Sequence, residues 1–176
     1  MKYLFLFSFA FAFAFFNLEL GYTATSPTWT HITYMFQHGT LVHLCINCFS
    51  FLAFFKVLER FYAPYKIAVV IVMVAFGSSF LCLYAKPVVG ASGMIYAMLG
   101  MFISLVRYRV ICLRNRAALY VLFLSTATFI SIGFFKHNSA GLLHLLCLIS
   151  GYTISSIKYI NFALKPPFGG RGSNTK

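Results

Sequence analysis

Charged residues are sparse along this chain, and the intervals between them predict helices that cross a membrane. The long charge-free intervals are 3–18, 20–55, 67–85, 87–106, 117–135 and 137–157. All but one have roughly the 20 residues that a bilayer crossing needs. The exception, 20–55, begins with a Gly-, Thr-, Ser- and Pro-containing stretch typical of a loop and becomes apolar after His38. We therefore expect an external loop over about 21–37, a helix over about 38–58, and six helices in all.

The composition places these helices in a lipid bilayer. Of the 176 residues, 61% are hydrophobic and only 9% are charged, which leaves too little polar surface for a soluble domain. We predict an all-α, multi-pass integral membrane protein with one domain over 1–163. The remaining residues, 164–176, contain Pro-Pro and Gly-Gly pairs and are predicted to form a short, basic, disordered cytoplasmic tail.

The distribution of positive charge predicts the orientation. The chain has 14 Lys and Arg residues against 2 acids, and in a soluble protein this excess would suggest nucleic acid. Here the basic residues lie between apolar runs without a nucleic-acid-binding signature, so we expect no nucleic-acid partner. An N-terminus inside the cell leaves only Lys86 and Lys136 on the outer side. Since basic residues accumulate on the cytoplasmic side, both termini should be cytoplasmic.

The first apolar segment has a second interpretation. A Met-Lys start followed by a Phe- and Ala-rich run also resembles a secretory signal peptide, whose cleavage would leave five helices. We favour a retained helix, because the run is rich in Phe and its small-x-small cleavage site is poor.

A metal site is the alternative reading of His43, Cys45 and Cys48. Structural zinc requires four converging ligands, and the sequence offers no clear fourth ligand for this group. The five cysteines lie in or beside apolar runs and are interpreted as small hydrophobic residues. We predict no metal and no cofactor.

Polar residues inside the apolar segments are the candidate functional groups, since they are costly in a membrane. His43 and Asn47 share a helix face at i and i+4, as do Ser92 and Tyr96. The helix with Ser92 should begin near residues 91–92, since proline and glycine precede it. His144 lies in the last helix. With about 1.5 Å of rise per residue, His43, Ser92 and His144 all fall roughly 8–10 Å below the outer surface.

A serine facing a histidine at this depth is an activated nucleophile, with the histidine accepting its proton. His43, Asn47 and the backbone N–H near Ser92 can donate hydrogen bonds to an oxyanion. The only acids are Glu19 and Glu59, and neither is placed to complete a triad. We therefore predict a Ser92–His144 dyad, with Tyr96 orienting the imidazole. The alternative is that these polar residues only form hydrogen bonds between helices.

The motifs together resemble the rhomboid intramembrane serine proteases over roughly residues 25–160. The matching motifs are His43-x-x-x-Asn47, Gly90-Ala91-Ser92-Gly93, and His144 followed seven residues later by Gly151. Further matching residues are Trp29, His38, Glu59, Arg60 and Tyr96. The chain departs from the family pattern at Thr30, where many bacterial members have arginine, at Ala63, and at Leu146 and Cys147, where glycines are usual.

The resemblance implies a six-helix bundle in which Ser92 is the nucleophile and His144 the general base. It also implies an oxyanion hole formed by His43, Asn47 and the Ser92 amide. Supporting roles are implied for Tyr96, His38, Gly90, Gly93, Gly151 and Trp29. The implied partners are the lipid bilayer and membrane-protein substrates with a transmembrane helix, cut near the outer face. The compact form implies a bacterial inner (plasma) membrane.

Two other functions compete with proteolysis. The first is a non-catalytic rhomboid-like protein that binds or escorts membrane helices. The presence of both Ser92 and His144 argues against it. The second is a small transporter or channel, for which the sequence has no internal repeat or pair of interrupted helices.

Overall fold

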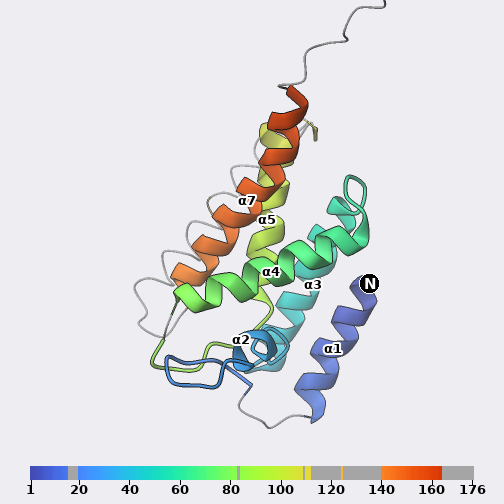
Figure 1. The fold of residues 1–176 in the computed structure, drawn as a ribbon. Helices are drawn as coiled ribbons and strands as arrows, with labels where there is room; N and C mark the ends of the chain where they lie inside the picture. Colours follow the sequence, from blue (N-terminus) through green and yellow to red (C-terminus); the bar gives the residue numbers. More distant parts are fainter. Residues whose placement is uncertain (16–19, 83, 109, 112–123, 125–139, 164–176) are drawn as a thin grey trace, which may run out of the picture.

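The computed structural model describes residues 1–15, 20–82, 84–108, 110–111, 124 and 140–163. This part of the chain is helical and contains no strand, which confirms the all-α prediction for it. The elements are α1 (Lys2–Phe15), α2 (Thr30–Thr33), α3 (Leu41–Leu58), α4 (Pro64–Leu81), α5 (Ser92–Arg107) and α7 (Gly141–Ala163) (Figure 1). Among the described helices, α3 and α4 have both the length and the apolar composition needed to cross a membrane.

One of the predicted helix starts is confirmed, and two differ from the prediction by a few residues. The helix expected near residues 91–92 begins at Ser92, as predicted. The helix expected over about 38–58 begins at Leu41, because the Thr40 side chain caps it by accepting a hydrogen bond from the His43 N–H at 3.1 Å. The last helix begins at Gly141 rather than near 137. The predicted helix 117–135 and the tail 164–176 lie outside the described residues, apart from residue 124.

Helices α5 and α7 pack in parallel with their backbones in contact (Figure 1). A Cβ added to Gly100 would collide with the Leu148 carbonyl oxygen and lie 2.6 Å from the Tyr152 nitrogen. A Cβ on Gly151 would collide with the Ala97 carbonyl oxygen. These glycines therefore allow the two helices to approach closely.

The bulkier residues at 146 and 147 are accommodated in this packing. Cys147 is fully buried, and its Sγ lies 3.5 Å from the Cβ position of Gly93. Leu146 is partly buried against the core. The glycine-poor sequence after His144 therefore does not separate α5 from α7.

Helix α1 packs against α3 through aromatic rings. The Phe9 ring is fully buried and lies edge-on to Phe51, with ring centroids 5.5 Å apart. At the N-terminal end of α1, the Lys2 Nζ lies 2.7 Å and 2.9 Å from the two carboxylate oxygens of Glu59, just after α3 ends. The start of α1 therefore lies beside the end of α3, and the two helices run in opposite directions.

The first loop packs against the loop between α4 and α5. Tyr22 and Val88 form an antiparallel bridge, in which the Val88 N–H donates to the Tyr22 carbonyl at 3.0 Å. The Gly90 N–H donates to the Tyr34 carbonyl at 2.8 Å. The Tyr34 side chain is fully buried and donates from its hydroxyl to the Ala75 carbonyl on α4 at 3.1 Å. The first loop thus holds the segment that leads into α5.

We expect Gly100→Ala to destabilise the fold, because the new methyl group meets backbone atoms of α7 that cannot move independently. Overpacking of this kind costs about 1–3 kcal/mol or more. Gly77→Ala in α4 is the matched control, since a Cβ there has nothing within 4 Å. It should leave stability equal or raise it by up to about 1 kcal/mol through helix propensity. Equal melting temperatures for the two variants in the same detergent would contradict close packing of α5 on α7.

Candidate active site

The hydroxyl of Ser92 and the imidazole of His144 are in direct contact. Ser92 Oγ lies 2.8 Å from His144 Nε2, although 52 residues separate the two in sequence. Ser92 is the first residue of α5 and His144 is in the first turn of α7. Since α5 and α7 are parallel and closely packed, their first turns lie side by side. A neutral histidine with an unprotonated Nε2 in this position can accept the serine proton.

Gly90 sets the direction in which the chain enters α5. Its φ is +117°, a conformation that residues with a side chain rarely adopt. The space around Gly90 is also too small for a side chain. A Cβ on Gly90 would lie 2.8 Å from His43 Cε1, 2.9 Å from His43 Nε2 and 3.3 Å from Asn47 Nδ2. Glycine is therefore required here for both backbone conformation and space.

The same contacts bring His43 and Asn47 to the backbone two residues before Ser92. Both come from the first turns of α3. Asn47 is buried, and within the described part of the chain its Nδ2 has no hydrogen-bond partner. An unpaired buried donor is costly in a folded protein and calls for an explanation. The Asn47 amide is thus a hydrogen-bond donor available beside the Ser92 backbone.

Tyr96 lies one helical turn after Ser92, and its ring stacks on the imidazole of His144. The rings of Tyr96 and His144 are 4.4 Å apart between centroids and inclined by 16°. Stacking fixes the plane of the imidazole without supplying a charge. Tyr96 therefore contacts His144 through its ring face.

His38 supports His43 from the side of α1. Its ring lies edge-on to His43 at 5.1 Å and edge-on to Phe9 at 5.6 Å. His38 Nδ1 lies 3.1 Å from the Phe36 carbonyl, which can only accept, so Nδ1 carries the proton. Burial and the neighbouring His43 lower the pKa of His38 to about 4. The ring is therefore neutral at pH 7.

The remaining predicted residues lie around this centre or away from it. Gly93 faces Tyr34 and Cys147 in the packing between helices, and Gly151 faces Ala97. Trp29 precedes α2 in the first loop and is 54% exposed. Glu59 is paired with Lys2, about 24 Å along α3 from His43 at the helical rise per residue. Glu19 lies outside the described residues.

The structure contains a second histidine–serine contact that the sequence did not indicate. His31 Nδ1 lies 2.8 Å from Ser79 Oγ, and the His31 ring is stacked between Phe80 and Tyr22. Ser79 is fully buried and donates to the Phe76 carbonyl at 2.6 Å, so it accepts from His31. Burial lowers the pKa of His31. This pair fastens α2 to α4, and its hydroxyl hydrogen is already committed to a carbonyl.

Comparison with known proteins identifies the family. The model of the rhomboid domain matches residues 25–161, whereas no curated protein matches the sequence. The matched region contains His43, Asn47, Ser92 and His144. Because this match spans well over half of the chain, the protein belongs to the rhomboid family, integral membrane proteins that are in general intramembrane serine proteases.

Proposed function

We propose that this protein is an intramembrane serine endopeptidase that cuts transmembrane helices of membrane proteins near the outer membrane face. The observation that carries the proposal is the 2.8 Å contact between Ser92 Oγ and His144 Nε2. Membership of the rhomboid family supports it. The reaction needs no group besides the protein and water.

Ser92 Oγ attacks the carbonyl carbon of the scissile peptide bond while its proton passes to His144 Nε2. The carbonyl oxygen becomes an oxyanion, which is stabilised by hydrogen bonds from the Asn47 amide, the His43 ring and the Ser92 N–H. His144 then gives the proton to the nitrogen of the leaving amine as the C–N bond breaks, which leaves an acyl-enzyme on Ser92. Water hydrolyses the acyl-enzyme in the same way, with His144 again as base.

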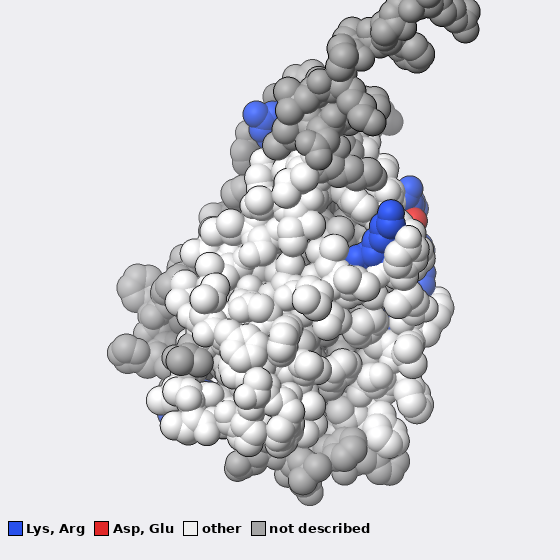
Figure 2. All heavy atoms as spheres, in the orientation of Figure 1, with Lys and Arg blue, Asp and Glu red and all other residues white. Residues whose placement is uncertain are grey.

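We infer that the bilayer is crossed six times by a domain over 1–163, with both termini and the short tail 164–176 in the cytoplasm. The Lys2–Glu59 ion pair supports this topology, because it joins two helix ends predicted to lie on the cytoplasmic side. In Figure 2 one group of Lys and Arg atoms lies beside the acidic atoms, near the turn between α3 and α4, and a separate group lies near the end of α5. The described surface between and below these groups is mostly uncharged. We further infer that this membrane is a bacterial inner (plasma) membrane.

Ser92→Ala should abolish cleavage of a model transmembrane substrate in proteoliposomes and leave the fold intact, because only one oxygen atom is removed. The measurement is product formation, with labelling of the wild-type protein by a fluorophosphonate probe as a second readout. Substantial cleavage by Ser92→Ala would remove Ser92 from the mechanism. A folded wild-type protein that neither cleaves nor labels would favour a non-catalytic rhomboid-like function.

His144→Ala should lower turnover and probe labelling of Ser92 together, because the proton acceptor is lost. General-base catalysis contributes about 10²–10⁴-fold. Glu59→Gln is the control, since it removes an acid that is paired with Lys2 away from the site, and it should retain most turnover. Labelling that persists at the wild-type rate in His144→Ala would show that another group activates the serine.

Asn47→Ala should lower kcat by up to about 10²-fold, because one oxyanion donor is lost while others remain. Its melting temperature should change little, since the Nδ2 that is removed has no hydrogen-bond partner among the described residues. A purely structural role makes the opposite prediction of reduced stability with unchanged turnover per folded molecule. Measuring both quantities on one purified sample decides between them.

A further inference from the structure

The first turn of α7 is capped by a side chain from another part of the chain. The Leu143 N–H donates to the phenol oxygen of Tyr84 at 3.3 Å. The first amides of a helix have no acceptor within the helix. Leu143 is fully buried, so water cannot replace Tyr84 as the acceptor. The residue that follows Leu143 is His144.

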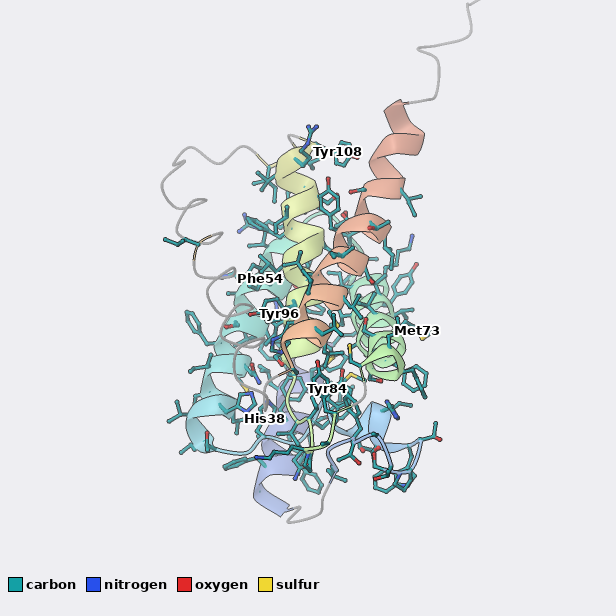
Figure 3. All side chains as sticks on the ribbon, turned by 90° about the vertical axis from the view of Figure 1, so that its left-hand side faces the viewer. His38, Phe54, Met73, Tyr84, Tyr96 and Tyr108 are labelled. Carbon is teal, nitrogen blue, oxygen red and sulfur yellow. The ribbon has the colours of Figure 1, made fainter. Side chains whose placement is uncertain are left out.

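Tyr84 is itself held in place. Its carbonyl accepts a hydrogen bond from the Ala24 N–H in the first loop at 2.9 Å. Its ring packs against the buried core, with its centroid 6.4 Å from that of Tyr22. Burial raises the pKa of the Tyr84 phenol, so the group stays neutral at physiological pH, and a phenol oxygen can accept a hydrogen bond in this state. Figure 3 shows Tyr84 beside the end of α7 at which the helix begins.

The loop that contains Tyr84 also leads to Ser92. Between the two residues, Val88 and Gly90 are fixed to the first loop by the hydrogen bonds to Tyr22 and Tyr34. One loop therefore determines where the nucleophile enters α5 and where α7 begins. The relative position of serine and histidine depends on both ends of this loop.

We propose that Tyr84 is a positioning residue, whose phenol oxygen fixes the first turn of α7 and thereby the imidazole of His144 relative to Ser92. This proposal rests on the proposed proteolytic function. Tyr84 does not touch the reacting atoms and acts only through the backbone of α7. Tyr96 fixes the ring plane by stacking, whereas Tyr84 fixes the helix that bears the ring.

Tyr84→Phe removes the acceptor and keeps the aromatic ring. Misplacement of a reacting group by about 1 Å can cost about 10²-fold in rate. We therefore expect kcat to fall by about 10-fold or more, with KM unchanged, because the shift affects the proton acceptor and not substrate binding. Labelling of Ser92 by the fluorophosphonate probe should slow by a similar factor.

Tyr22→Phe is the matched control. Tyr22 is a buried neighbour of Tyr84, and in the described residues its hydroxyl has no hydrogen-bond partner. Removing that hydroxyl should leave kcat, KM and labelling at wild-type values. A Tyr84→Phe protein with the kinetics of Tyr22→Phe would overturn the proposal. So would a Tyr84→Phe protein that melts at a lower temperature but has unchanged kcat per folded molecule.

Hydrogen–deuterium exchange supplies a readout that does not depend on proteolysis. Loss of the acceptor should speed exchange of the Leu143 amide in Tyr84→Phe relative to both the wild type and Tyr22→Phe. Unchanged exchange would show that Tyr84 does not hold this turn. If the wild-type protein neither cleaves nor labels, the proposed function is wrong and the catalytic role of Tyr84 falls with it, while the exchange still decides whether Tyr84 caps α7.

Discussion

The close approach of α5 and α7 is the constraint on which the site depends. The backbones touch where Gly100 and Gly151 lack a side chain, and Ser104 and Ser156 bond across the same interface at 3.1 Å. Two helices held in parallel at this spacing keep their first turns level. A hydrogen bond between Ser92 and His144 then follows from their places in those turns. Without a driving force from water, such packing relies on van der Waals contact and on hydrogen bonds between helices.

The candidate site also depends on buried polar groups whose hydrogen-bonding capacity is not used within the protein. Most buried polar atoms in proteins are paired, as His31 and Ser79 are here. Among the residues that the structure describes, the Asn47 Nδ2 departs from this rule, beside the Gly90 backbone. The two histidine–serine contacts differ in the hydrogen-bond partner of the serine hydroxyl. The Ser79 hydroxyl donates to a carbonyl on its own helix, whereas the Ser92 hydroxyl faces His144.

The sequence predicted the parts of this arrangement that depend on local chemistry. Glycine and proline before Ser92 marked the start of α5, and sparse charges marked the apolar segments. The start of α7 was missed by several residues, because the charge-free interval begins well before Gly141. Helix α2 was not predicted, because it lies inside the segment that was assigned to the external loop. The contacts of His31 with Ser79 and of Tyr84 with Leu143 were also missed, since they join residues 48 and 59 positions apart. The depth estimate that placed Ser92 level with His144 had no counterpart for these two pairs, because no motif singled out His31, Ser79, Tyr84 or Leu143.

The scarcity of acids bears on how the imidazole of His144 is held. The chain has two acidic residues, and Glu59 is engaged by Lys2 at the far end of α3. A carboxylate buried beside His144 would require desolvation of a charge, which is expensive within a membrane unless it is fully paired. The Tyr96 ring stacks on the imidazole of His144, and the Tyr84 hydroxyl accepts a hydrogen bond from the backbone of its helix. Both contacts are neutral, so within the described part of the chain the imidazole of His144 is held without a buried charge.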